Sequence, residues 1–157
     1  MSSSISLFFA GDFAPVRRYE KLVIKKGYKI FGGLQNNISE SDISFLNLET
    51  PLCINGKPIK KTGPNFKAHP DCINAVKDAG FDVVGLANNH IMDFGNEGVL
   101  ETIDSCKIAG LTICGAGKNI VEAQKTVFIE RCGLKIAYIA VAEHEFCIAG
   151  KFSAGAA

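Results

Sequence analysis

The sequence lacks a strong charge of either sign. Its 17 lysines and arginines against 16 aspartates and glutamates leave a formal net charge of +1 over 157 residues. Such a balance creates no field able to gather nucleic acid or an anionic membrane surface, and nothing in the chain resembles a nucleic-acid-binding motif. We therefore expect no nucleic-acid partner.

Long apolar runs are also missing. No run approaches the roughly 18 apolar residues that a helix needs to cross a bilayer. The first residues carry no basic segment, and the apolar run at residues 7–10 is too short for the core of a signal peptide. These absences predict a chain without a membrane span and with a cytoplasmic location.

Several motifs of well-known chemistry are absent. The six cysteines form no C-x-x-C pair, and most lie in apolar segments, where a thiol behaves as a small hydrophobe, so a disulfide framework is disfavoured. There is no Walker loop and no G-x-S-x-G elbow, and the Gly-Ala-Gly at 115–117 does not complete a dinucleotide fingerprint. A cysteine nucleophile stays open, although no cysteine is singled out.

The sequence does contain short apolar runs that alternate with helical patterns. The chain has the size of one domain and is 47% hydrophobic. This predicts a single α/β domain over residues 1–157. We expect strands at 5–10, covered on both faces, at 43–48, in the first half of 80–95 and at 111–114, with an antiparallel hairpin at 126–130 and 134–142 that would make the sheet mixed. Helices are expected at 34–40, 71–79, 97–109 with Asn96 as its cap, and 120–123.

Polar side chains follow several of these strands. Asp12 comes after the first strand and Glu49 after the second, while Asn88, Asn89 and His90 follow the third. Open α/β sheets place their ligands at the carboxyl ends of strands, so these side chains are expected to share one crevice. A further polar cluster, Glu143-His144-Glu145, follows the second strand of the hairpin.

Two carboxylates, an amide oxygen and an imidazole form a donor set that suits Mg²⁺, Mn²⁺, Fe or Zn²⁺, and a second metal fits if one carboxylate bridges. The matching reaction is hydrolysis of a phosphoester or related anionic bond, with His90 as proton donor to the leaving group. The long irregular segment at 53–70 adds Lys67 and His69, which could face an anionic substrate or could be solvated.

The motifs GDF (11–13), NLETPL (47–52), GPNFKAHP (63–70), GFDVVGLANNHIMDFGNEGVLETID (80–104) and GAG (115–117) resemble the CapA, or poly-γ-glutamate (capsule) synthesis, family. That resemblance implies a metallophosphatase-like, calcineurin-type α/β/β/α sandwich. It implies that Asp12, Glu49 and Asn89 bind metal and that His90 meets the phosphoryl group. Asn47, in the second motif, joins Lys67 and His69 as an expected substrate-binding residue.

The sequence departs from the wider superfamily pattern at two points. Ala14 stands where that pattern has the histidine of Asp-x-His, and the later histidine-containing metal motif is absent. We therefore expect the amino-terminal portion of the full fold, truncated at its C-terminus, with Asn88, Glu143, His144 and Glu145 as candidate additional ligands. Two interpretations stay open: a metal-dependent hydrolase, or a non-catalytic module binding an anionic polymer or a partner protein. Unpaired strand edges also predict a homo-oligomer.

Overall fold

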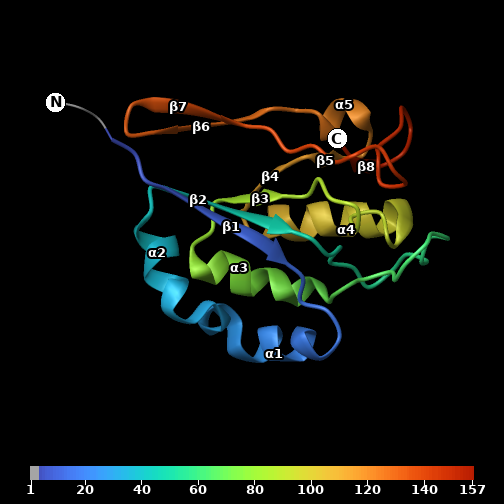
Figure 1. Cartoon of the computed structure of the whole chain (residues 1–157), viewed down its shortest axis with the longest axis horizontal. Helices are drawn as coiled ribbons and strands as arrows, with labels where there is room; N and C mark the ends of the chain where they lie inside the picture. Colours follow the sequence, from blue (N-terminus) through green and yellow to red (C-terminus); the bar gives the residue numbers. More distant parts are fainter. Residues whose placement is uncertain (1–3) are drawn as a thin grey trace.

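The computed structural model describes residues 4–157 and centres on a four-stranded parallel sheet (Figure 1). The strands follow one another in chain order across the sheet. Because every neighbour is parallel, all four carboxyl ends lie at the same edge of the sheet. The strands are β1 (Leu7–Phe13), β2 (Ile43–Leu48), β3 (Val83–Gly85) and β4 (Thr112–Cys114).

The two faces of this sheet pack against different layers, as the period-2 alternation of strand side chains requires. On β2, Leu46 and Leu48 join the large core under the helices, whereas Ile43 and Phe45 belong to a second, smaller core with Tyr138. Ile43, Leu46 and Leu48 are at most 2% exposed. Burial on both faces explains why β2 is apolar almost throughout, and its predicted range of 43–48 is confirmed.

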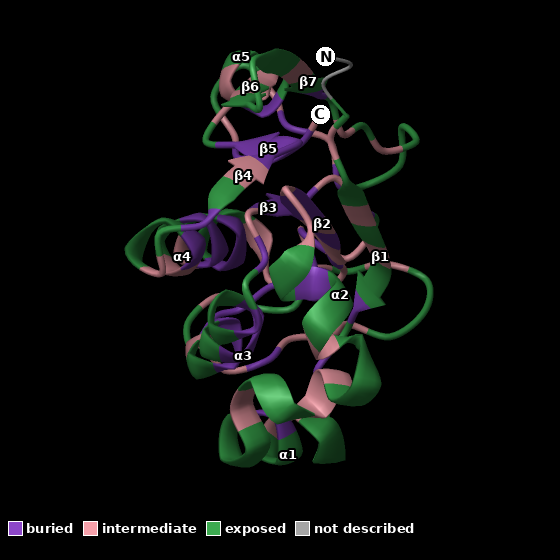
Figure 2. Ribbon diagram, turned by 90° about the vertical axis from the view of Figure 1, so that its left-hand side faces the viewer, coloured by how far each residue is buried: buried purple, intermediate pink, exposed green. Residues whose placement is uncertain are grey.

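Helices supply the connections between the parallel strands (Figure 1). In Figure 2 the sheet-facing sides of α3 and α4 are buried, whereas α1 is mostly exposed. α3 buries Ile73, Val76 and Ala79 at helical spacing and ends at Gly80, whose φ of 97° is the left-handed conformation of a helix stop. The segments are α1 (Arg18–Lys26), η1 (Gly27–Leu34), α2 (Gln35–Glu40), η2 (Pro70–Cys72), α3 (Ile73–Ala79), α4 (Gly95–Ile108) and α5 (Ile120–Ala123).

The antiparallel pairings lie outside the parallel sheet. β6 (Val127–Arg131) and β7 (Leu134–Tyr138) form the predicted hairpin, which lies over the face of the sheet opposite α1–α3 (Figure 1). The fold is therefore α/β as expected, but its parallel and antiparallel strands occupy separate sheets instead of one mixed sheet. β5 (Ala116–Gly117), expected to be only a turn, pairs with β8 (Gly155–Ala156), in a segment where no strand was predicted.

Three local predictions were wrong. β1 is not covered on both faces, because it is the edge strand and its outward Phe9 is 61% exposed. It also continues past residue 10 to Phe13 through an irregularity in its register with β2, so Asp12 lies within the strand. Asn96 does not cap α4, since that helix begins one residue earlier, after Phe94, and has no side-chain cap.

Among the helices of residues 4–157, none combines the length and apolar character needed to cross a membrane.

Candidate functional site at the strand ends

Asp12 and Glu49 are brought together by the pairing of β1 with β2. In that register Asp12 lies opposite Asn47, and Glu49 follows two residues after Asn47. The Asn47 side-chain amide donates to both carboxylates, from Nδ2 to Asp12 Oδ1 at 2.7 Å and to Glu49 Oε2 at 2.8 Å. The two acids predicted from separate strand ends therefore share one hydrogen-bond donor.

The pKa of Glu49 is changed by its burial and by the charges around it. Partial burial is the main cause that raises the pKa of its carboxyl above the ordinary value, and the neighbouring Asp12 carboxylate raises it further. The Asn47 hydrogen bond and the His90 ring act in the opposite direction, and Asp93 adds a weaker upward effect. The Asp12 carboxylate is thus close enough to oppose the ionisation of Glu49, and the two acids form a site of negative potential.

The loop after β3 is tied to the end of β2 by Asn88. Its buried Nδ2 donates to the Leu48 carbonyl at 2.8 Å, and its Oδ1 accepts from the His90 backbone N–H at 3.0 Å. Gly115 (φ 84°) packs under this loop, where a Cβ would meet the Ala87 Cβ at 2.6 Å. Asn88 therefore holds the loop in place, and the adjacent Asn89 is exposed.

His90 is held by a buried ion pair that our sequence reasoning did not assign. Its Nδ1 lies 2.7 Å from Asp93 Oδ2 and 3.3 Å from Lys61 Nζ. Asp93 also pairs with the Lys61 ammonium, and the side chains of these two residues are 0% and 3% exposed. The shorter contact assigns the Nδ1 proton to a bond with Asp93, which leaves Nε2 as the free nitrogen of the ring.

Phe66 completes the surroundings of this pair. Its backbone N–H donates to Asp93 Oδ2 at 2.7 Å, and its ring lies 4.7 Å from the His90 ring between centroids. The irregular loop thus supplies the Lys61 cation, a backbone donor and an aromatic wall to a histidine that follows β3. Because the partners are 27 to 32 residues apart along the chain, only the folded structure joins them.

The other expected substrate-binding residues are engaged elsewhere. Lys67 Nζ donates to the Ile54 carbonyl at 2.8 Å and lies 4.7 Å from the centre of the Phe94 ring. His69 Nδ1 accepts from the Asp71 N–H at 3.2 Å and so caps η2. Both are half-buried, and each has a local structural role.

The expected additional ligands Glu143, His144 and Glu145 are exposed. The next residue, Phe146, lies near Lys61. Lys61 Nζ lies 4.8 Å from the centre of the Phe146 ring, which places this segment beside the buried ion pair. Across residues 4–157, no group of three or more His, Cys, Asp or Glu side chains is arranged to hold a metal ion.

The cysteines are poor nucleophiles. All six are free, and five are buried. Burial raises the pKa of Cys53 and Cys114 to about 11 and that of Cys72 and Cys106 to about 12. Burial likewise raises the pKa of Cys147, while a hydrogen bond to Asp42 raises that of the exposed Cys132. Since the thiolate is the nucleophile, this chemistry is disfavoured at neutral pH.

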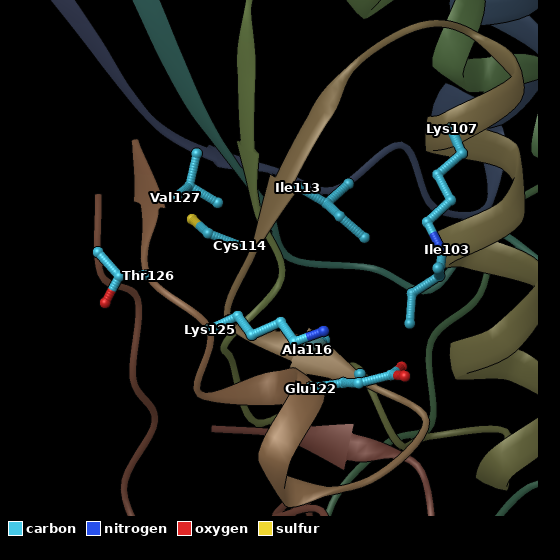
Figure 3. A pocket seen from close by; sticks show the side chains of 11 residues that line it. Ile103, Lys107, Ile113, Cys114, Ala116, Glu122, Lys125, Thr126 and Val127 are labelled. Atoms are coloured by element: carbon cyan, nitrogen blue, oxygen red, sulfur yellow. The ribbon is translucent and has the colours of Figure 1, made fainter. Parts of the chain in front are cut away.

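A separate hollow of about 360 Å³ lies beside β4 and the base of α5 (Figure 3). Ile103 and Lys107 border it from α4, and Glu122 and Lys125 from α5 and the residues after it. None of Asp12, Asn47, Glu49, Asn88, Asn89 and His90 lines it. The carboxylates and His90 therefore define a different place on the molecule.

A parallel α/β sheet with two carboxylates and an Asp-paired histidine after its strands is consistent with part of a metallophosphatase-like fold. The family model "Bacterial capsule synthesis protein PGA_cap" matches residues 6–155. The chain belongs to this family, and the expected resemblance to CapA proteins is confirmed.

Several relatives of the chain have names that refer to the synthesis of a capsule or of a polymer. The chain is 30% identical over 140 residues to the capsule biosynthesis protein CapA of Bacillus anthracis, covering 87% of this chain and 34% of that protein. It is 29% identical over 130 residues to the PGA biosynthesis protein CapA of Bacillus subtilis, covering 81% and 34%. A probable polyglutamine synthesis accessory protein of Mycobacterium tuberculosis is 32% identical over 89 residues, covering 57% and 23%. The chain thus spans about a third or less of the length of these relatives.

Proposed function

We propose that this chain carries the site of a metal-dependent hydrolase that cleaves a phosphoester or related anionic bond in capsule or poly-γ-glutamate biosynthesis. The observation that carries the proposal is the Asp93-held His90 beside the Asp12–Glu49 carboxylate pair. The names of the relatives support the biosynthetic setting.

In this proposal His90 is the general acid. Asp93 accepts a hydrogen bond from the Nδ1 proton, so in the imidazolium form the second proton, at Nε2, is the one available to the leaving-group oxygen as water forms the new P–O bond and the old one breaks. Phe66 packs against the ring and limits its rotation. Lys61 pairs with Asp93 and supplies a counter-charge to that carboxylate in its buried position.

The donor chemistry of the carboxylate pair fits a hard divalent cation. Asp12 and Glu49 are oxygen ligands, and the pKa of Glu49 is raised by its burial and by the charge of Asp12. The carboxamide oxygen of Asn89, in the loop after β3, is the further donor we assign to it. When bound, such a cation polarises a phosphoryl oxygen and lowers the pKa of water.

A Glu49→Gln variant tests this assignment through stability. A carboxyl whose pKa is raised by folding opposes folding at pH values above that pKa, and the opposition fades as pH falls and the group is protonated. We expect metal-free Glu49→Gln to melt about 2 °C above wild type at pH 7, with the difference closing near about pH 4. Differential scanning calorimetry across this pH range measures it.

Added Mn²⁺ gives the second half of that test. A cation present at about 100 times its Kd stabilises a protein by about 2.7 kcal/mol, or roughly 5–10 °C here. We expect this rise for wild type and for Glu130→Gln, a control that removes an exposed glutamate of β6, but not for Glu49→Gln. Equal rises in all three proteins would show that Glu49 does not hold the cation.

The alternative, a non-catalytic module for an anionic polymer, rested on the basic loop. Of the four lysines in residues 53–70, Lys61 is committed to Asp93 and Lys67 to the Ile54 carbonyl, which leaves Lys57 and Lys60 exposed. This favours the hydrolase. Metal-independent binding of polyglutamate that weakens in Lys60→Ala would instead support the module.

We also propose that copies of the chain associate through β1. This strand pairs only with β2, and its outward Leu7 and Phe9 are 42% and 61% exposed. An unpaired edge with apolar side chains favours strand pairing between molecules. Light scattering should give a dimer for wild type and a monomer for Phe9→Lys. A wild-type monomer at the same concentration would refute the association.

A further inference from the structure

A hollow of about 460 Å³ lies beside Phe66 and the start of α1, and it has no role in the proposed function. Val16, Arg17, Arg18, Tyr19 and Phe66 line it. Its volume lies within the range of small-molecule sites. Phe66 is shared with the candidate active site, because the same ring lies 4.7 Å from the His90 ring. A molecule in this hollow would therefore contact the same aromatic ring that packs against His90.

The lining combines apolar surface with two cations. The Arg17 guanidinium carbon lies 5.9 Å from the centre of the Phe66 ring. That of Arg18 lies 5.0 Å from the Tyr19 ring, and its Nη2 donates to the Tyr19 hydroxyl at 3.0 Å. Stacking on aromatic faces orients a guanidinium while leaving most of its N–H donors free.

No acidic residue lines the hollow to neutralise these arginines. Glu20 is the nearest acid along the chain, and its Oε2 accepts a hydrogen bond from the His69 backbone N–H at 2.8 Å. Both arginines are exposed. The charge of this surface is thus complementary to an anion and opposite to that of the Asp12–Glu49 pair.

The backbone at Arg17 is strained. Its φ of 55° and ψ of −123° lie outside the regions that non-glycine residues favour. Within residues 4–157, Cys132 is the only other non-glycine residue with positive φ. Strain of this kind persists where a particular placement of the chain is required, and here it occurs at a residue that lines the hollow.

We propose that this hollow binds the organic leaving group of the substrate, an apolar or aryl group that carries its own carboxylate or phosphate. Arg17 and Arg18 bind that second anion with paired hydrogen bonds, and the Phe66 and Tyr19 rings pack against the apolar body. This inference rests on the proposed hydrolase, and it narrows the substrate class to phosphoesters with a second anionic group.

The first experiment measures binding without catalysis. Benzoate and phenylphosphonate, which separate the carboxylate source from the phosphate source, are titrated into the metal-free protein by ligand-observed NMR. We expect at least one to bind and its Kd to rise tenfold or more in Arg17→Met/Arg18→Met, consistent with the loss of charge-assisted hydrogen bonds. Lys21→Met, which removes an exposed cation of α1 outside the hollow, should leave Kd unchanged.

The second experiment compares 4-carboxyphenyl phosphate with phenyl phosphate as substrates in the presence of Mn²⁺. We expect the double arginine variant to raise KM tenfold or more for the carboxylated substrate and not for phenyl phosphate. Arginine-dependent binding without any hydrolysis would reject the hydrolase and keep the anion site. His90-dependent hydrolysis with neither binding nor KM affected by the arginines would reject the anion site alone.

Discussion

Replacing His90 with glutamine should lower kcat/KM for an aryl phosphate by about 10²–10⁴-fold, the usual contribution of a positioned general acid. Glutamine cannot supply the Nε2 proton, although it can fill the space beside Phe66 and accept or donate one hydrogen bond. The measurement is steady-state hydrolysis with Mn²⁺ present.

The melting temperature and the Mn²⁺-induced rise in it are the controls for His90→Gln. Both should stay within a few degrees of the wild-type values, because the Asp12–Glu49 pair is unchanged. Hydrolysis at the wild-type rate by a folded His90→Gln protein would remove His90 from the reaction. The family membership of the chain would be unaffected by that result.

Asp93→Leu should destabilise the fold by about 3–5 kcal/mol, the typical cost of leaving one partner of a buried ion pair alone. Lys61 is 3% exposed and would keep its charge without a counterion, and the Phe66 N–H would lose its acceptor. Urea unfolding measures the change. The result would identify Asp93 as the residue that organises the loop around His90.

The double variant Asp93→Leu/Lys61→Met separates structure from chemistry. Replacing a buried ion pair by apolar side chains of similar size is often neutral, so most of the lost stability should return. Hydrolysis should remain low, because the His90 ring has no partner at Nδ1. A double variant as unstable as Asp93→Leu, or a single variant as stable as wild type, would contradict the ion-pair account.

The parts of the fold that the sequence predicts well are those with local patterns. The apolar run of β2 and the helical spacing of Ile73, Val76 and Ala79 mark elements whose burial follows from their own residues. The positions of Asp12 and Glu49 at the ends of parallel strands follow from the same patterns, since topology then brings them to one edge.

The partners of His90 could not be predicted in this way. Lys61 and Phe66 lie in a loop without periodicity, and no local rule says which charge of a loop will be buried. Asp93 lies three residues after His90 in the N-N-H-x-x-D-x-G motif. That spacing was the one sign in the sequence that Asp93 could pair with His90. The exposure of β1 could not be predicted either, because whether a strand lies at the edge of a sheet depends on the order of the strands and not on its own residues.

The most direct test of the central claim is a crystal structure of this protein grown with Mn²⁺, with anomalous diffraction collected to locate the metal. The account predicts an anomalous peak between the Asp12 and Glu49 carboxylates, on the side of the site where His90 lies. Well-ordered carboxylates still bridged by the Asn47 amide, with no peak between them at saturating Mn²⁺, would contradict it.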